Sequence, residues 1–168
     1  MRTFLFCFLT LFLVFGLVSC QKESESHPFK VMLTDAPFDA QEVNVEIREV
    51  RVNYAKDSTG WVALTTTAGI YNLLALQNGV QTVLATGNSP GGTIKELRFI
   101  LGTANTIKIN NETYPLTIPS GAETGLKIKV NRKLAATLDN LVVDFDAGLS
   151  IIKTGLNEYK LKPVLKIK

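Results

Sequence analysis

The sequence predicts an all-β fold, an antiparallel β-sandwich that carries one short helix. From Pro28 onward, apolar and polar residues alternate in short runs, which is the period of a strand with one buried face. Clusters of Gly, Pro, Asn, Asp and Ser separate these runs at regular intervals. Short strands with such punctuation are typical of two packed antiparallel sheets, of the immunoglobulin-like or prealbumin-like kind.

The first long strand contains a change of phase. Its apolar residues occupy odd positions from Val43 to Ile47 and even positions from Val50 to Tyr54. One inserted residue returns the same face of a strand to the core, so this switch predicts a β-bulge at Arg48-Glu49.

The later strands and the helix follow from the same patterns. Period-two runs predict strands at residues 97–101, 107–109, 114–118, 126–130, 141–145 and 159–167. Turn signals lie at residues 57–60, 89–92, 110–111, 119–121 and 155–157. The helix is expected at residues 71–78, where Gly79 supplies a stop signal.

The N-terminus has the layout of a secretory signal. Arg2 precedes an apolar stretch, residues 3–18, that is shorter than the roughly 20 residues of a membrane-spanning helix. The stretch ends in Leu-Val-Ser-Cys at residues 17–20, which resembles the lipobox of bacterial lipoproteins. The resemblance implies cleavage before Cys20 and acylation of its thiol, for example with palmitate. The alternative is a short membrane anchor with an incidental cysteine.

These features divide the chain into a signal peptide (1–19), a lipidated Cys20 with a flexible tether (20–28) and a single β-sandwich domain (29–168). A lipid anchor in the outer membrane is expected, with the domain facing the periplasm or the cell surface. Gln21 after the lipid site is not the aspartate associated with inner-membrane retention. About 150 residues can bury two-thirds of their surface in one core.

Composition excludes several functions. The part after the signal has 17 basic and 15 acidic residues, and this near-neutral balance gives no reason to expect nucleic-acid binding. Cys7 leaves with the signal and Cys20 carries lipid, so the folded domain has no thiol for a disulfide, a nucleophile or a metal.

The segment at residues 31–37 (Val-Met-Leu-Thr-Asp-Ala-Pro) is similar to the opening of the domain of unknown function 4382 family, found in bacterial lipoproteins. Other similar segments follow in the same order and extend the resemblance over residues 30–167: 43–45, 60–62, 73–79, 97–98, 114–116, 119–121, 125–127, 144–146, 150–151 and 159–163. Ile94 departs from the family's usual tyrosine but fills the same apolar strand position. The resemblance implies an architecture and a cellular location, and no chemistry.

Four carboxylates are the sharpest candidates for a ligand or metal site. Asp35 and Asp39 follow the first predicted strand, while Asp144 and Asp146 leave one face of a later strand around a core-facing Phe145. If both segments meet at one edge, the four groups form oxygen ligands for Ca²⁺. The favoured alternative is that they accept backbone N–H groups in turns.

An enzyme needs a nucleophile or a proton carrier, and the sequence is poor in both. The only histidine is His27, in the tether. Asp144 and Asp146 are the remaining candidates for a carboxylate pair. We therefore expect no enzyme and no cofactor, with a metal-assisted hydrolase as the weaker alternative.

Lysines on the polar faces of two predicted strands are a second candidate site. They are Lys127 and Lys129 on one strand, and Lys160, Lys162, Lys166 and Lys168 on the last. If the strands are neighbours, the lysines form a basic stripe for acidic polysaccharide or lipid headgroups. The favoured alternative is that they protect strand edges from aggregation, as Pro163 does.

Trp61 and Tyr54 are candidates for an aromatic platform that stacks on sugars, although burial in the core is the expected role. Taken together, these patterns predict a lipid-anchored, non-enzymatic binding module for a glycan or protein ligand. The alternative is a fimbria-like structural subunit, for which Lys30 is the nearest basic cleavage position.

Overall fold

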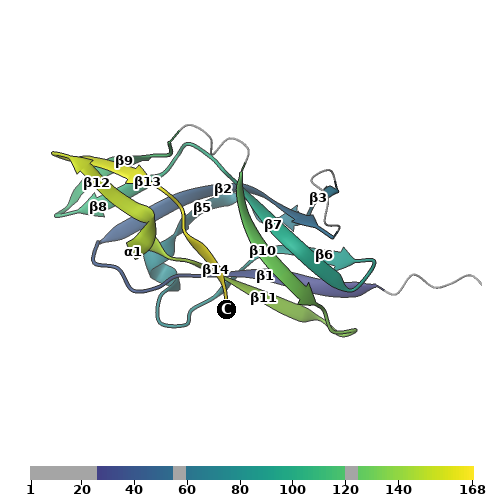
Figure 1. The fold of residues 1–168 in the computed structure, drawn as a ribbon. Coiled ribbons are helices and arrows are strands. Elements are labelled where there is room, and N and C mark those ends of the chain that lie inside the picture. Colours follow the sequence, from purple (N-terminus) through teal and green to yellow (C-terminus); the bar gives the residue numbers. More distant parts are fainter. Residues whose placement is uncertain (1–25, 55–59, 120–124) are drawn as a thin grey trace, which may run out of the picture.

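Two β-sheets enclose a shared apolar core in the computed structural model, which describes residues 26–54, 60–119 and 125–168 (Figure 1). The signal peptide, Cys20 and most of the tether lie outside the described residues, as do most of the turns expected at residues 57–60 and 119–121. No helix within the described ranges is long and apolar enough to cross a bilayer.

The first sheet has five strands, with the N-terminal strand in its centre. Its order is β14 (Leu165–Ile167), β11 (Asp139–Phe145), β1 (His27–Thr34), β6 (Thr82–Ser89) and β4 (Thr65–Thr66). Strand β1 runs antiparallel to β6 but parallel to β11, where Phe29 is opposite Asp139. More than 100 residues separate these two strands, so no hairpin imposes the antiparallel direction on them.

The second sheet is larger and is built around β2. Its order is β10 (Leu126–Lys133), β7 (Thr93–Leu101), β2 (Glu42–Asn53), β8 (Thr106–Ile109), β9 (Glu112–Thr117), β13 (Glu158–Leu161) and β12 (Ile151–Gly155). Two short strands, β3 (Trp61–Ala63) and β5 (Gly69–Asn72), also pair with β2. Strands β9 and β13 are parallel. The predicted sandwich is therefore confirmed, with two parallel ladders in place of a fully antiparallel arrangement.

The predicted bulge in β2 is present. The register of β2 against β7 shifts between Ile47 and Glu49. On either side of the shift Val45, Ile47, Val50 and Val52 are all fully buried, so the extra residue does return the same face to the core.

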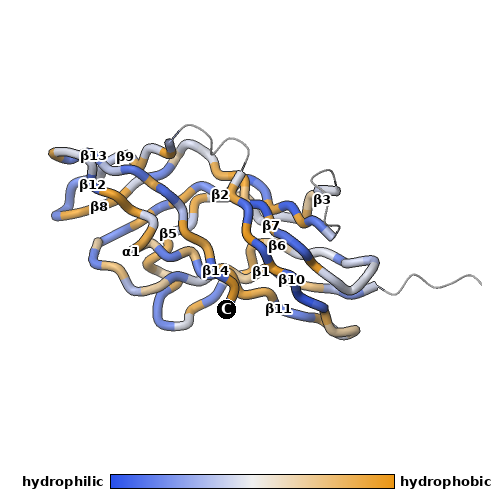
Figure 2. The backbone as a smooth tube through the Cα atoms, in the orientation of Figure 1, coloured by the Kyte–Doolittle hydropathy of each residue, from blue (hydrophilic) through white to orange (hydrophobic). Residues whose placement is uncertain are grey.

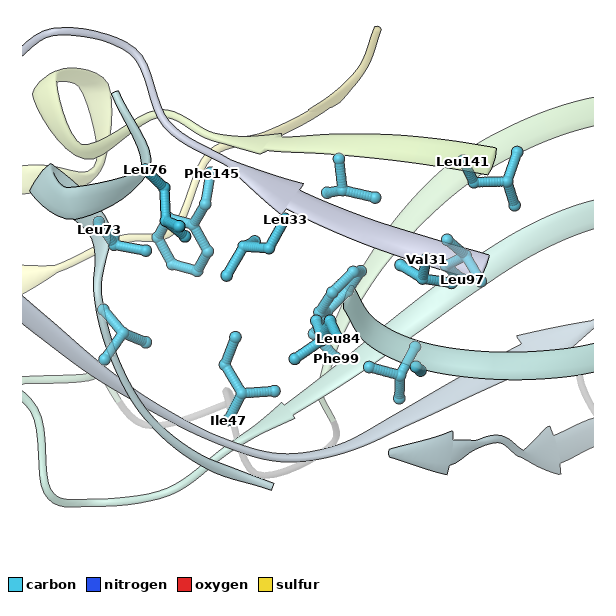
Figure 3. Packing of buried hydrophobic residues seen from close by; sticks show 14 of the residues in the cluster. Val31, Leu33, Ile47, Leu73, Leu76, Leu84, Leu97, Phe99, Leu141 and Phe145 are labelled. Atoms are coloured by element: carbon cyan, nitrogen blue, oxygen red, sulfur yellow. The ribbon is translucent and has the colours of Figure 1, made fainter. Parts of the chain in front are cut away.

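The inner faces of both sheets supply the core. Figure 3 shows Leu33 and Phe145 of the first sheet packed toward Ile47 and Phe99 of the second, and all four side chains are buried. In each of these strands the apolar residues occupy alternate positions and face the core. The alternation of hydrophilic and apolar residues along a strand can be followed in β10 (Figure 2).

The helix expected at residues 71–78 is only partly present. Tyr71 and Asn72 are extended because they pair with β2, and a 3-10 helix, η1 (Leu73–Leu76), follows. The Asn72 side chain caps it by accepting from the Leu74 N–H. Gly79 does not close the helix but lies in a turn with Asn78, both with positive φ. Across residues 26–54, 60–119 and 125–168, the one α-helix is α1 (Ala147–Ser150), which the sequence pattern did not predict.

The strand predicted at residues 159–167 is two strands in different sheets. Pro163 lacks an N–H and separates β13 from β14. The flanking N–H groups of Lys162 and Val164 donate to the backbone oxygen and the hydroxyl of Ser150, at 2.7 and 2.8 Å. The chain therefore crosses between the sheets at this point.

Candidate functional site

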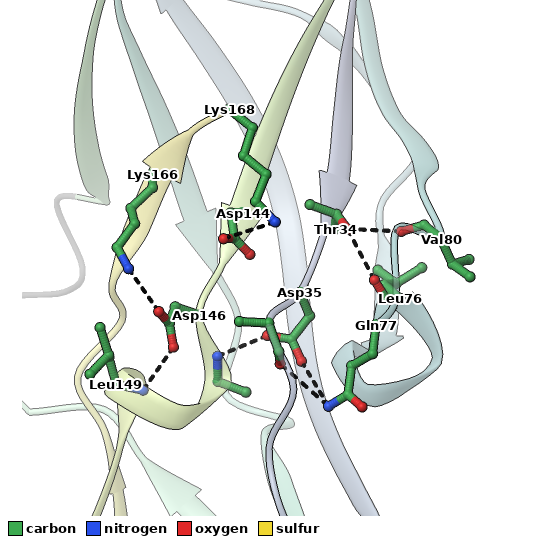
Figure 4. A network of polar contacts seen from close by, with 12 residues as sticks. Thr34, Asp35, Leu76, Gln77, Val80, Asp144, Asp146, Leu149, Lys166 and Lys168 are labelled. Carbon is green, nitrogen blue, oxygen red and sulfur yellow. Dashed lines mark hydrogen bonds and ion pairs between the residues drawn. The ribbon is translucent and has the colours of Figure 1, made fainter.

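The carboxylate of Asp35 connects three segments at the end of β1 (Figure 4). Its Oδ1 accepts from the Ala147 N–H at 2.9 Å, and the Gln77 side-chain amide donates to Oδ2 at 3.5 Å. The residue is only 2% exposed. Burial raises the pKa of Asp35 to about 6, although the hydrogen bond from Ala147 opposes this increase.

Asp146 caps α1 and binds a lysine of β14. Its Oδ1 accepts from the Leu149 N–H at 2.9 Å, and Lys166 donates to Oδ2 at 2.9 Å. The hydrogen bond from Lys166 lowers the pKa of the carboxylate, so Asp146 is held in its charged form.

The remaining two carboxylates do not complete a ligand set. Asp144 forms an ion pair with Lys168 at 3.2 Å, while its other oxygen is buried and lacks a hydrogen bond to any described residue. Asp39 is exposed. Within the described ranges, no three His, Cys, Asp or Glu side chains lie close enough to hold a metal ion. Asp35 and Asp146 thus hold segments of the fold together, Asp144 is paired with Lys168, and the four aspartates form no metal-ligand cluster within the described residues.

The lysines expected to share one stripe are dispersed. Lys160 lies on β13 and Lys166 on β14, in different sheets, with Lys162 in the connection between them. Lys166 and Lys168 are also paired with Asp146 and Asp144. The expectation of one continuous strand was wrong here, because the chain changes sheets at Pro163.

Lys127 and Lys129 lie instead on the outer face of the second sheet. Lys127 is directly opposite Arg98 of β7, and Arg98 is directly opposite Arg51 of β2. We call Lys127, Arg98 and Arg51 the cationic row. The neighbouring row places Lys129 opposite Glu96, and Glu96 opposite Asn53.

Trp61 completes this outer face. It pairs with Asn53 at the start of β3 and is partly buried, but it does not pack against the core cluster. The guanidinium of Arg98 lies over its ring, 4.1 Å from the centroid, and the Lys127 ammonium is 5.8 Å away. The expectation that Trp61 is buried in the core was therefore wrong. Strand β3 pairs with β2 as an extra strand, and the Trp61 ring lies on the outer face of β3.

Tyr54 does not join Trp61 in a platform. It packs against the core cluster, and its hydroxyl donates to the Asn88 carbonyl at 2.7 Å. Burial raises the pKa of Tyr54. Of the two aromatic candidates, only Trp61 lies on the outer face.

The polar groups of this face are incompletely satisfied. Arg51 donates to Glu49 at 2.8 Å, but its Nε–H has no acceptor among the described residues. The same holds for Arg98 Nε and Trp61 Nε1, and all three nitrogens are shielded from water. Buried donors without acceptors are rare in folded proteins and need an explanation.

Sequence reasoning named Lys127, Lys129 and Trp61 but missed Arg51 and Arg98. The parity of β2 and β7 does place both arginines on the outer face, since they alternate with buried valines, Leu97 and Phe99. The missing information was the strand order β10-β7-β2, which alone brings them beside Lys127.

Comparisons with known proteins give a family but no activity. A family model described as a domain of unknown function (DUF4382) matches residues 27–163, which include every strand except β14. No curated protein and no solved structure matches the chain.

Proposed function

Because the chain belongs to the family described as a domain of unknown function (DUF4382), which supplies no chemistry, we propose a function from the geometry. The protein is a lipid-anchored envelope lipoprotein, held in the outer membrane through Cys20. Its β-sandwich is a non-enzymatic module that binds a glycan on the outer face of the second sheet.

The arrangement of Trp61 and Arg98 supports this proposal most directly. The Arg98 guanidinium lies over the Trp61 indole, 4.1 Å from the ring centroid, so an aromatic ring and a group rich in N–H donors lie side by side on this face. Sugars have apolar ring faces and many hydroxyl acceptors, so such a platform suits both parts of a sugar. The donors left without acceptors, Trp61 Nε1 and Arg98 Nε, are the groups that hydroxyls can satisfy after small side-chain adjustments.

A binding role also suits the remaining polar residues. Asp35 and Asp146 are engaged with backbone N–H groups, and Asp144 and Asp146 with lysines. Among these carboxylate oxygens, only Asp144 Oδ1 is buried without a hydrogen-bond partner in the described residues, and the engagement of the others supports a binding role over acid–base chemistry. At the start of β1, the Nδ1–H of His27 donates to the Ala135 carbonyl at 3.1 Å.

The glycan part of the proposal is tested with the full-length lipidated protein in detergent. Trp61 is the only tryptophan of the chain, so its fluorescence reports on this face without labelling. Glycans retained from an array of neutral and acidic polymers should change the emission saturably, and Trp61→Ala should lose their retention. If no glycan is retained, or if Trp61→Ala binds as well as the wild type, the proposal is wrong.

The lipid anchor is tested separately. Cys20→Ala should leave an uncleaved or soluble precursor that takes up no labelled palmitate, because the thiol is the only acyl acceptor at the proposed cleavage site. Cys7→Ala is the matched control and should be labelled normally. Normal labelling of Cys20→Ala would show that the lipid is attached elsewhere or not by this pathway.

A further inference from the structure

We infer that the ligand is an acidic polysaccharide, whose carboxylate or sulfate groups bind the cationic row of Lys127, Arg98 and Arg51. This inference rests on the proposed glycan-binding function and specifies its ligand class. It is carried by the register of three strands and by the state of the charges on them.

The register places three positive charges in direct succession. Neighbouring strands are about 4.8 Å apart, and like charges directly opposite each other destabilise a sheet. Arg98 is opposite Lys127 on one side and opposite Arg51 on the other. Selection for stability alone would disfavour three adjacent like charges, whereas such locally destabilising arrangements are expected at functional sites.

Among the described residues, only one of the three cations, Arg51, has an ion-pair partner. Arg51 is paired with Glu49 at 2.8 Å. In the described part of the chain, Arg98 and Lys127 have no ion pair, although Glu96 lies in the neighbouring row. An anionic ligand would therefore relieve repulsion that the described acidic residues leave uncompensated at Arg98 and Lys127.

Arg98 is held in place for such a ligand. Its guanidinium lies over the Trp61 ring, 4.1 Å from the centroid, which restricts the side chain, and the Lys127 ammonium lies 5.8 Å from the same centroid. A planar guanidinium binds a carboxylate or sulfate through two parallel N–H···O bonds, which a lysine cannot do. The Nε–H groups of Arg51 and Arg98 lack acceptors among the described residues but are shielded from water, so a ligand oxygen reaches them only after these side chains shift.

The size of the row favours a polymer over a small anion. Three strands span about 10 Å at the usual strand spacing, which exceeds the width of one carboxylate or sulfate. A chain of acidic sugars presents several such groups in line, while its rings meet the Trp61–Arg98 platform. Trp61 lies on a sheet face under a guanidinium and not at a projecting apolar tip, so insertion into a bilayer is disfavoured.

The test measures binding of the full-length lipidated protein to immobilised polygalacturonate, dextran sulfate and neutral dextran, and to anionic phospholipid vesicles. Both acidic polymers should bind, and the affinity should fall steeply as salt is raised from 50 to 500 mM. Their ratio distinguishes a carboxylated from a sulfated ligand. Neutral dextran should bind at least tenfold more weakly.

Variants of the row locate the binding. Arg98→Gln should lower affinity at least tenfold, and Arg98→Lys, which keeps the charge but loses the planar fork, should lower it by less. Lys160→Gln is the matched control, because Lys160 is an exposed lysine of β13 away from the row. Circular dichroism and melting temperatures check that each variant folds.

The possible outcomes distinguish the inference of an acidic ligand from the more general proposal of glycan binding. Equal binding of neutral and acidic polymers, unchanged by Arg98→Gln, would overturn the acidic ligand but leave glycan binding intact. If the protein binds only vesicles and Arg98→Gln loses that binding, the cationic row binds lipid headgroups. That result would overturn both the acidic polysaccharide and the glycan-binding proposal. Failure of every glycan to bind would also overturn both.

Discussion

The buried carboxylate of Asp35 makes the stability of this protein depend on pH. Its pKa is about 6 in the fold and 3.8 in an exposed aspartate. Between these values the folded state holds a proton that the unfolded chain has released. The stabilising contribution of this group is therefore complete below pH 3.8 and is lost as the pH rises through 6.

Asp35→Asn should remove this dependence. At pH 8 the variant is expected to be more stable than the wild type by about 2–3 kcal/mol, since one pKa unit corresponds to 1.36 kcal/mol. The amide oxygen still accepts from Ala147, and the two proteins should converge near pH 4. Urea unfolding at pH 4, 6 and 8 measures the difference.

Asp39→Asn is the control for that experiment, because Asp39 is exposed, and it should unfold like the wild type throughout. Asp146 acts in the opposite direction, since its lowered pKa gives stability that is lost on acidification. Only the difference between Asp35→Asn and the wild type isolates Asp35. A constant difference across pH would contradict the assignment.

Phe145 gives a second prediction at the scale of single residues. It is fully buried in the core cluster that also contains Leu33 and Leu76 (Figure 3). Phe145→Ala should cost about 3–5 kcal/mol of unfolding free energy, the usual cost of emptying a buried aromatic position. Leu149→Ala, at an exposed position of α1, should cost far less. Similar losses in the two variants would be inconsistent with the core described above.

At the level of elements, α1 depends on its cap. Asp146→Ala removes the acceptor for the Leu149 N–H and the partner of Lys166, and should cost about 1–2 kcal/mol. Asp146→Asn keeps Oδ1 as the cap and loses only the charge, so its loss should be smaller. Thermal unfolding at pH 7 compares them. Equal losses would mean that the ion pair, and not the cap, stabilises this segment.

Elements were predictable where the signal is local. The bulge of β2 follows from a parity switch inside one strand, and the Asn110-Asn111 turn between β8 and β9 follows from residues that tolerate positive φ. The division of residues 159–167 was not predictable from parity. It depends on Ser150, which binds the chain on both sides of Pro163.

At the level of the whole molecule, the sandwich follows from alternation but the order of its strands does not. Strand β1 lies beside β11 through contacts more than 100 residues apart, and no local pattern encodes that choice. Because strand order is not encoded in any local pattern, the sequence also could not predict which residues meet at the candidate site. Lys127 was recognisable as a surface candidate, whereas Trp61 was expected in the core, and the row through Arg98 and Arg51 exists only in the folded register.

The assembled molecule should not respond to Ca²⁺. The oxygens of Asp35 and Asp146 already accept from N–H groups, and Asp144 is paired with Lys168. A ligand that binds only the folded state would raise the melting temperature saturably. We expect no such rise up to millimolar Ca²⁺. A saturable rise of several degrees, lost in the Asp35→Asn/Asp146→Asn double variant, would falsify this prediction.

The central place of β1 has a mechanical consequence. If the chain is tethered at Cys20 while a ligand holds the second sheet, tension enters the domain through the first residues of β1. That strand is paired on both sides, with β6 and β11. A pull along its axis loads both ladders in shear, so their hydrogen bonds resist together and do not open one by one. The resistance of the domain to pulling is then set by its unfolding rate and not by its equilibrium stability.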